Sequence, residues 1–405
     1  MAFDELTPHP HQLTRRDFIA VAGAAALTPT VAQAQASDGP KIKLGLIGCG
    51  GRGQWITNLF VKHGGYTISA CADYFEDRVN EAGEKFQVPA NCRFTGLSGY
   101  KKLIESGVDA VAIESPPYFH PEHAEAAVAA SRHVYVAKPI AVDVPGCQTI
   151  ARLGKLATEK KLCFLVDFQS RANEFYIEAL KRVHAGALGT FCFGEAWYHC
   201  GPLRDRGMAA GNEGRLRDWA HDQRLSGDII VEQNIHSLDV MNWIMRVPPL
   251  QCTGTGGRKS RLICDTWDNY ACVFEYPDNV GFAFSSFQAK MFGTRGGIVA
   301  NIFGSKGALL TEYGGEVMIR GDADSFYRGG KTNAIYQEGA STNIATFHKS
   351  ITGKNYSNLT VAPSVQSNLV AILGRTATRC KKTVTWKEML KSGEKIDADL
   401  SGLKA

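Results

Sequence analysis

Three patterns that mark common classes of protein are missing from this sequence. Its eleven cysteines are odd in number and include no Cys-x-x-Cys pair, so neither a disulfide framework nor a zinc ribbon is indicated. The formal net charge is +5, but lysines and arginines form no run of five or six, which favours a solvated surface over a nucleic-acid interface. Beyond the first 36 residues, no segment is apolar for long enough to span a membrane.

The first 36 residues predict a cleavable export signal. Arg15 and Arg16 precede an apolar stretch over Ile19–Leu27, and Ala32–Ala36 offers the small residues that a signal peptidase needs. Adjacent arginines in this setting resemble a twin-arginine signal, which carries folded proteins out of the bacterial cytoplasm. We therefore expect a periplasmic or extracytoplasmic protein without a membrane anchor after cleavage. The alternative is a disordered tail with a chance arginine pair.

Residues 41–167 alternate between apolar strands and helices, a pattern typical of a doubly wound parallel sheet. Two of the expected strands are continuous apolar runs, as in parallel strands that are covered on both faces. The expected strands are Lys41–Ile47, Tyr66–Asp73, Ala110–Glu114, His133–Ala137 and Leu162–Asp167. The expected helices are Trp55–Lys62, Glu76–Phe86, Pro121–Ala130 and Val144–Glu159.

Residues 168–405 predict a second, α+β domain built on a largely antiparallel open sheet. We expect this domain to bind the substrate and to form a homo-oligomer through its open sheet face. Its expected strands are Thr190–Tyr198, Tyr270–Tyr276, Val280–Gln288 and Ile298–Phe303. Its expected helices are Glu174–Ala185, N-capped by Asn173, then Ile235–Ile244 and 364–378, the last packing back on the first domain.

A glycine motif of the form G-x-G-x-x-G directly follows the first strand and opens the first helix, the context that a dinucleotide site requires. Gly48 makes the tight turn, Gly50 lets the backbone approach a pyrophosphate, and Gly53 allows close packing of helix and strand. The helix N-terminus then stabilises the phosphates. We expect the whole motif to contact the cofactor: Gly48, Gly50, Gly51, Arg52 and Gly53.

The end of the second strand carries an acid 20 residues after the motif. A carboxylate at Asp73 would accept hydrogen bonds from the adenosine ribose and repel a 2′-phosphate, which favours NAD over NADP. Arg78 offers the opposite preference if it turns towards a 2′-phosphate. NAD is the cofactor that we expect.

Three further segments resemble the glucose–fructose oxidoreductase, inositol dehydrogenase and rhizopine catabolism (Gfo/Idh/MocA) family. They are Ser115-Pro116-Pro117 with His120, the strand 133–139 that ends in Lys138-Pro139, and the glycine-led segment Gly227–Asp239. The resemblance covers nearly all of the chain after the signal. It implies a Rossmann domain, an open-sheet domain, a nicotinamide cofactor and a carbohydrate-like substrate, and it adds Ser115, Pro116, His120 and Lys138 to the cofactor side. Two positions depart from the family pattern: Ala137 replaces the glutamate of Glu-Lys-Pro, and Glu232 stands where aspartate is more usual.

Lys138, His236 and Glu232 are the catalytic candidates. Oxidation of a secondary alcohol requires removal of the hydroxyl proton, and an ammonium just past a parallel strand would stabilise the developing alkoxide. A histidine suits general acid–base work, with a carboxylate to orient it. Glu232 and His236 are four residues apart and share a face if one helix includes both; they would otherwise be a core histidine and a helix-start acid.

Substrate contacts are expected from Arg171, Tyr198 and Asp239, since arginine and aromatic side chains suit sugar hydroxyls and rings. Trp197, His199 and Trp219 are weaker candidates. Glu232, His236 and His199 would suit a divalent metal, but nothing in the sequence requires one, and we expect none.

The leading hypothesis is an oxidoreductase that acts on a secondary hydroxyl of a sugar, glycoside or cyclitol. A second hypothesis is a glycoside hydrolase that works by transient oxidation, elimination and reduction. A third is a non-catalytic sugar sensor that retains NAD. Because an exported enzyme meets no pool of free NAD, we expect tight cofactor binding and a reaction that is redox-neutral overall.

Overall fold

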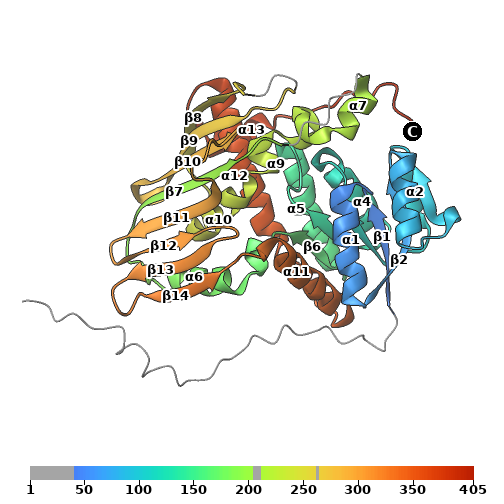
Figure 1. Ribbon diagram of the computed structural model, residues 1–405, viewed down its shortest axis with the longest axis horizontal. Helices are drawn as coiled ribbons and strands as arrows, with labels where there is room; N and C mark the ends of the chain where they lie inside the picture. The colour runs from blue at the N-terminus through green and yellow to red at the C-terminus, as the bar shows by residue number, and fades with distance from the viewer. Residues whose placement is uncertain (1–40, 204–210, 261–263) are drawn as a thin grey trace, which may run out of the picture. The chain divides into compact units, whose positions relative to one another are not determined.

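Two β-sheets organise the computed structural model of the protein (Figure 1). The structure describes residues 41–203, 211–260 and 264–405, and the predicted export signal lies outside these ranges. Within the described ranges no helix is long and apolar enough to cross a bilayer.

The first sheet has six parallel strands in the order β3-β2-β1-β4-β5-β6. Every residue of the strand β4 is buried, because helices cover the sheet on both faces. The predicted doubly wound α/β fold is confirmed. The strands are β1 (Ile42–Ile47), β2 (Tyr66–Asp73), β3 (Arg93–Thr95), β4 (Ala110–Ile113), β5 (His133–Ala137) and β6 (Phe164–Asp167).

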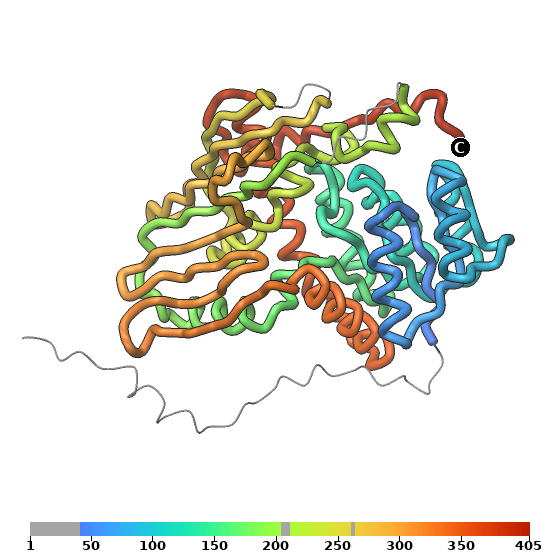
Figure 2. The backbone as a smooth tube through the Cα atoms, in the orientation of Figure 1, coloured from blue at the N-terminus to red at the C-terminus, as the bar shows by residue number. Residues whose placement is uncertain are grey.

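Two apolar cores lie against the two faces of this sheet. One face packs on α1 (Gly51–His63), α2 (Glu76–Lys85) and α11 (Ile335–Thr352), and the other on α3 (Gly99–Glu105), α4 (His120–Ala129) and α5 (Val144–Glu159). Figure 2 shows α11 returning from the far end of the chain to lie beside α1. The helix α1 begins at Gly51, four residues before the predicted start, so the glycine motif itself opens the helix.

The second sheet has nine strands in the order β14-β13-β12-β11-β7-β10-β9-β8-β15. All neighbours are antiparallel except β7 and β10, which confirms the largely antiparallel sheet. The strands are β7 (Phe191–Cys200), β8 (Gln251–Gly257), β9 (Asn269–Tyr276), β10 (Val280–Gln288), β11 (Gly297–Gly304), β12 (Gly307–Thr311), β13 (Glu316–Gly321), β14 (Tyr327–Lys331) and β15 (Val384–Thr385).

Three helices cover one face of the second sheet: α6 (Glu174–His184), α10 (Ile235–Met245) and α12 (Val361–Cys380). As predicted, Asn173 caps α6, since its side chain accepts hydrogen bonds from the backbone of Phe175 and Tyr176. The remaining helices are short: α7 (Gly211–Arg217), α8 (Gln223–Ser226), α9 (Ile229–Glu232) and α13 (Trp386–Ser392), with the 3-10 turns η1 (Ala90–Cys92), η2 (Pro117–Phe119), η3 (Ser170–Ala172), η4 (Trp219–His221) and η5 (Pro277–Asn279).

The helix α12 contacts both sheets. It is longer at both ends than the predicted 364–378, and Pro363 lies in its first turn, where a missing N–H costs no hydrogen bond. It packs against α5 and β6 on one side and against β8 and β9 on the other. Asn368 on α12 bonds the backbone of Ile140 and Ala141, so it holds the chain that follows Lys138.

Candidate active site

A cavity of about 360 Å³ lies at the carboxyl ends of β1, β2 and β4. The glycine motif forms its floor, and Asp73, Ser115 and Pro116 are also among its lining residues. Gly48 has a φ of +97°, and a Cβ there would lie 2.6 Å from the backbone carbon of Glu114. Glycine is therefore required at Gly48 by both conformation and space.

The two later glycines of the motif face different surroundings. A Cβ at Gly53 would overlap the carbonyl oxygen of Gly48, so this glycine permits close packing inside the turn. A Cβ at Gly50 would meet only the end of the Arg78 side chain, at 3.7 Å, and one at Gly51 would meet nothing within 4 Å. The backbone N–H groups at the start of α1 are thus open to a ligand, as a dinucleotide pyrophosphate requires.

Asp73 lies at the end of β2, where the adenosine ribose of a dinucleotide binds in such folds. Its carboxylate accepts hydrogen bonds from the backbone N–H of Cys49 (2.8 Å) and of Phe75 (3.0 Å). Burial raises the pKa of Asp73 above its ordinary value. These contacts fix the carboxylate beside the glycine turn.

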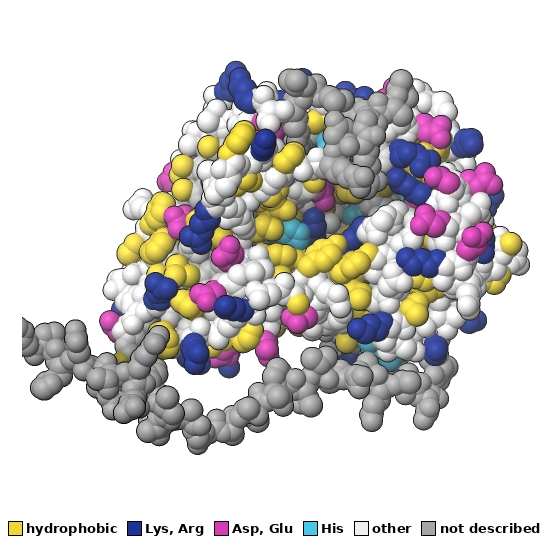
Figure 3. Space-filling view, in the orientation of Figure 1, with side chains coloured by type: hydrophobic (Ala, Val, Ile, Leu, Met, Phe, Trp, Pro, Cys, Tyr) yellow, Lys and Arg dark blue, Asp and Glu magenta, His cyan; other side chains and the backbone are white. Residues whose placement is uncertain are grey.

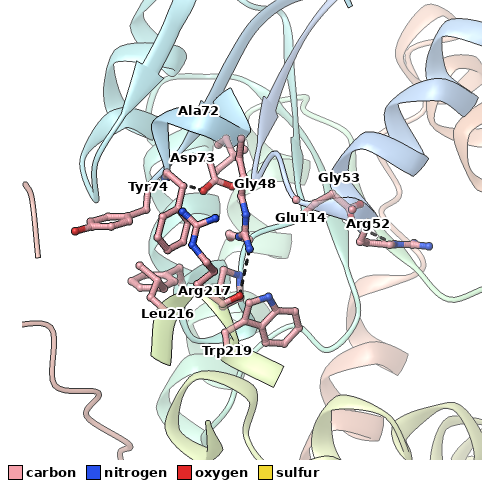
Figure 4. Close-up of a pocket in the computed structure, with 18 of the residues that line it drawn as sticks. Gly48, Arg52, Gly53, Ala72, Asp73, Tyr74, Glu114, Leu216, Arg217 and Trp219 are labelled. Carbon is pink, nitrogen blue, oxygen red and sulfur yellow. Dashed lines mark hydrogen bonds and ion pairs between the residues drawn. The ribbon is translucent and has the colours of Figure 1, made fainter. Parts of the chain in front are cut away.

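The wall opposite Asp73 comes from the second half of the chain (Figure 4). Arg217 at the end of α7 bonds both oxygens of Asp77, at 2.9 and 3.0 Å, and its guanidinium lies 3.9 Å from the ring centre of Phe75. Arg78 donates to the carbonyl oxygen of Arg217. Trp219 lines this same cavity. The structure therefore places Trp219 at the dinucleotide pocket.

Lys138 follows β5, and its ammonium points at the end of α9. Its Nζ donates to the Glu232 carbonyl oxygen (2.5 Å) and to Glu232 Oε1 (3.1 Å). The condition for a shared helical face is not met: α9 ends at Glu232, and α10 begins at Ile235, the predicted start, with His236 as its second residue. Gly227 and Asp228, both at positive φ, bend the chain into α9. The two side chains are instead brought together through Lys138.

The His236 side chain is partly buried beside this ion pair, and its Nδ1 atom is fully buried. Burial lowers the pKa of His236 well below its ordinary value, and the positive charges of Lys138 and Arg52 lower it further. The ring lies 5.3 Å from that of Tyr313, and its Nδ1 has no hydrogen-bond partner within the described residues. A neutral imidazole with an unused nitrogen can accept a proton.

Arg52 links the glycine motif to the ends of two more strands. It bonds Glu114, after β4, at 3.2 Å and Asp167, at the end of β6, at 2.5 Å. Burial alone would lower the pKa of Arg52, but the two carboxylates outweigh burial and raise it. Neither acid was among the expected site residues. Both lie at carboxyl ends of parallel strands, where ligands bind in open α/β sheets, and that position was the available signal.

Ser115, Pro116 and His120 behave differently from one another. Ser115 and Pro116 line the cavity. Both ring nitrogens of His120 contact backbone carbonyl oxygens, those of Pro139 (2.8 Å) and Ser115 (2.7 Å), and burial lowers the pKa of His120 to about 4. His120 thus ties the end of β4 to the residue after Lys138 and is not among the residues that line the cavity.

The predicted substrate residues divide into two groups. Arg171 Nε bonds both oxygens of the buried Asp239, at 3.0 and 2.9 Å, while Arg171 Nη2 is buried without a partner among the described residues. Tyr198 is close enough to Glu232 and Tyr313 for their charges to act on it, although burial is the main reason that the Tyr198 pKa is raised.

The metal alternative finds no support in the geometry. His199 bonds Ser285 across the β7–β10 pair, away from Glu232 and His236. In the ranges that the structure describes, no three His, Cys, Asp or Glu side chains are grouped to hold a metal ion.

Comparisons with known proteins match both halves of the chain. Residues 42–168 match the model of the "Oxidoreductase family, NAD-binding Rossmann fold", and residues 176–310 match the "GFO/IDH/MocA C-terminal domain". The NAD-binding character of the first match confirms the cofactor expected from the glycine motif.

Curated relatives are more distant. A "Glycosyl hydrolase family 109 protein" of Solibacter usitatus is 27% identical over 229 residues, 52% of this chain and 51% of that protein. An "Inositol 2-dehydrogenase" of Klebsiella pneumoniae is 27% identical over 205 residues, 50% of this chain and 54% of that protein. The chain thus spans about half the length of these relatives.

Solved structures share the fold over most of the chain. Scyllo-inositol dehydrogenase from Lactobacillus casei, with bound NAD(H) and scyllo-inositol, is 20% identical with a TM-score of 0.66 and covers 86% of this chain and 99% of its own. The WlbA dehydrogenase from Bordetella pertussis is 17% identical with a TM-score of 0.72, covering 85% and 98%. The two family models together with this fold show that the chain belongs to the Gfo/Idh/MocA oxidoreductase family.

Proposed function

We propose that the protein is an exported NAD-dependent oxidoreductase that acts on a secondary hydroxyl of a sugar, glycoside or cyclitol. The observation that carries this proposal is His236, a partly buried imidazole whose pKa is lowered by burial and by the charges of Lys138 and Arg52, and whose Nδ1 has no partner among the described residues. In the space-filling view, histidine and basic side chains are visible together near the centre of this face (Figure 3).

Each side chain has a defined task in such a reaction. When bound, the nicotinamide ring supplies hydride acceptance and return. With its proton on Nε2, His236 accepts the hydroxyl proton at Nδ1. The Lys138 ammonium stabilises the alkoxide, and Glu232 holds that ammonium in place through two contacts.

A screen of polyols, free sugars and glycosides tests the oxidoreductase. Full-length protein is incubated with each compound, and products are followed by mass spectrometry beside NADH absorbance. Conversion of a carbohydrate that disappears in Lys138→Ala supports the proposal. Binding of a sugar without any conversion would instead support the non-catalytic sensor.

A second function, redox-neutral glycoside cleavage, is favoured by the relatives named as family 109 glycosyl hydrolases. Oxidation of the ring carbon two positions from the anomeric centre acidifies the C–H of the carbon between them. Loss of that proton expels the leaving group from the anomeric carbon, water adds to the resulting double bond, and the carbonyl is reduced again. The net reaction is hydrolysis of the glycosidic bond, and the hydride taken by NAD in the first step returns to the sugar in the last. Many products per enzyme without added NAD and without NADH build-up would support this route. One NADH per product, with strict need for added NAD, would restore the plain dehydrogenase.

Export and assembly complete the proposal. The arginine pair and apolar stretch of the first 36 residues support twin-arginine export of a folded, cofactor-loaded protein. A homo-oligomer is supported by the outward face of the second sheet, where Phe193, Val273 and Phe287 are 43%, 48% and 38% exposed. Such apolar side chains on a sheet face suit contact with a second copy of the chain.

Two experiments test these proposals. Sedimentation of the purified protein tests the assembly, and signal-dependent appearance in a periplasmic fraction tests the export.

A further inference from the structure

Two side-chain atoms beside the dinucleotide pocket have unused hydrogen-bonding capacity. Arg52 gives Nε to Glu114 and Nη2 to Asp167, while its Nη1 is buried without a partner in the described part of the chain. Glu114 accepts at Oε2, and its Oε1 is likewise buried and unpartnered. Leaving a buried donor and a buried acceptor unmade costs free energy. The two atoms therefore point to a ligand that supplies one acceptor and one donor.

The position of the pair narrows the identity of that ligand. Arg52 and Glu114 both line the cavity, and Figure 4 shows them on the opposite side of Gly48 from Asp73. A dinucleotide with its adenosine at Asp73 and its pyrophosphate at Gly50 extends its second nucleoside in this direction. The charges of Lys138 and Arg52 act on Glu114 and His236 respectively, so the pair also borders the catalytic candidates Lys138 and His236.

We propose that Glu114 and Arg52 bind the carboxamide of the nicotinamide ring, an inference that rests on the proposed NAD-dependent function. Glu114 Oε1 accepts from the amide NH2, and Arg52 Nη1 donates to the amide oxygen. A primary amide offers this one donor group and one acceptor, whereas a carboxylic acid in its place offers two acceptors and a negative charge. The pair thus selects nicotinamide over nicotinic acid.

The surroundings hold both groups ready. The Arg52 guanidinium lies 4.7 Å from the Trp55 ring centre and 5.2 Å from that of Tyr336. Burial raises the pKa of Glu114 to about 7, while Arg52 acts in the opposite direction and favours the carboxylate. The strand register, which pairs Ile113 with Val136, sets Ala137 beside Glu114. Alanine offers no side-chain acceptor, and both oxygens of Asp167, the next acid along this edge, already accept hydrogen bonds, so Glu114 supplies the unpartnered carboxylate oxygen.

Displacement of bound NADH from the full-length protein, followed by NADH fluorescence, tests the inference. The competitors are NAD, its nicotinic acid analogue (deamido-NAD), and ADP-ribose, which lacks the ring. We expect the wild type to prefer NAD over deamido-NAD by roughly tenfold. In Glu114→Gln this ratio should fall towards one, with ADP-ribose displacement unchanged. The exposed Glu105→Gln makes the same chemical change outside the pocket and should match the wild type.

Four results would overturn the inference. Equal binding of NAD and deamido-NAD by the wild type does so without any variant. An unchanged ratio in a folded Glu114→Gln also does so. Arg52→Lys keeps the charge but loses the forked donors, so it must weaken NAD relative to ADP-ribose, and an unaltered ratio there counts against the pair. If NADH does not bind and ADP-ribose has no effect, the cofactor assignment fails first, and the inference with it.

Discussion

The two ends of the dinucleotide pocket are built in different ways. At the adenosine end, the glycine motif and Asp73 lie within 26 consecutive residues, and a strand, turn and strand fix their geometry. At the other end, Lys138 meets Glu232, 94 positions further along the chain, only in the folded protein, and His236 lies close enough for the charge of Lys138 to act on it. The adenosine end therefore depends on local backbone geometry, whereas the other end depends on packing between distant segments.

This difference separates binding from chemistry. The adenosine end is formed mainly by backbone groups and a fixed carboxylate. It is therefore suited to bind the same part of the cofactor whatever the substrate. The catalytic end is formed by charged side chains whose ionisation depends on one another. Changes at one end should therefore leave the other largely intact, and the following variants test that separation.

The largest effect is expected at the catalytic end. Lys138→Ala and His236→Ala should each lower turnover by roughly 10²–10⁴-fold, the usual contribution of a general acid–base or charge-stabilising group. NADH binding should stay close to that of the wild type in both variants. Steady-state rates on the substrate found in the carbohydrate screen, with NADH fluorescence titration alongside, measure both quantities. Near-wild-type rates in both variants would remove these residues from the mechanism.

The next largest effect is expected at Gly50. Valine there should weaken NADH binding by roughly 10–100-fold, because its side chain occupies pyrophosphate space and removes charge-assisted backbone hydrogen bonds. The cofactor-free protein should keep its melting temperature, since a Cβ meets only the end of Arg78.

Gly53→Ala is the matched comparison for Gly50→Val. Its Cβ overlaps the Gly48 carbonyl oxygen, so the melting temperature itself should fall. Thermal unfolding of both cofactor-free variants separates the two effects. A Gly50→Val protein with full NADH affinity would contradict the assigned phosphate site.

A smaller effect is expected at Asp73. Asp73→Asn keeps an acceptor for the backbone N–H of Cys49 but removes the charge that repels a 2′-phosphate. The preference for NAD over NADP should fall by about tenfold, measured as the ratio of dissociation constants. Asp324→Asn, at an exposed position, should leave the ratio unchanged, and an equal ratio in Asp73→Asn would assign the preference to other residues.

The smallest effect concerns stability and pH. The pKa of Glu114 is about 7 in the folded protein, above its ordinary value of 4.5. An acid whose pKa is raised on folding stabilises the folded protein fully at pH values below its ordinary pKa. This stabilisation is lost as the pH rises through the pKa of the folded protein. The free energy of unfolding of cofactor-free Glu114→Gln should therefore gain on the wild type between pH 5 and 8, by on the order of 1–3 kcal/mol. Chemical denaturation at several pH values measures this gain, and a constant difference would show that Glu114 does not titrate in that range.

The sequence predicted best where local pattern decides structure. The strands at Tyr66–Asp73 and His133–Ala137 and the helix Val144–Glu159 have the predicted bounds, because each is a complete apolar or amphipathic run. The strand β14 was missed, since its sequence YRGGK has no apolar alternation and pairing with β13 defines it.

The parts of the site that lie close together in the sequence were predicted, and the parts that depend on distant residues were not. The glycine motif and Asp73 lie together as expected. The pairing of Arg52 with Glu114 and Asp167, and the wall formed by Arg217, depend on contacts between residues 62 to 140 positions apart, which a single sequence does not encode as a pattern. The predicted helix start at Ile235 is confirmed, but the short helix α9 that carries Glu232 was not predicted, because four residues are too few to show a helical period.

The helix α11 has a consequence for how this protein comes to be made. Its side chains complete an apolar core of the first sheet through Ala340, Ile344 and Phe347, yet α11 begins 168 positions after the last strand of that sheet at Asp167. At translation rates of roughly 5–20 residues per second, the sheet waits on the order of 10–30 s on the ribosome for its missing cover. During this interval the first half exposes apolar surface and is at its most prone to aggregation. Synthesis of α11, not emergence of the Rossmann strands, is then the event that completes the core, so a protein truncated before Ile335 should be a substrate for chaperones and proteases.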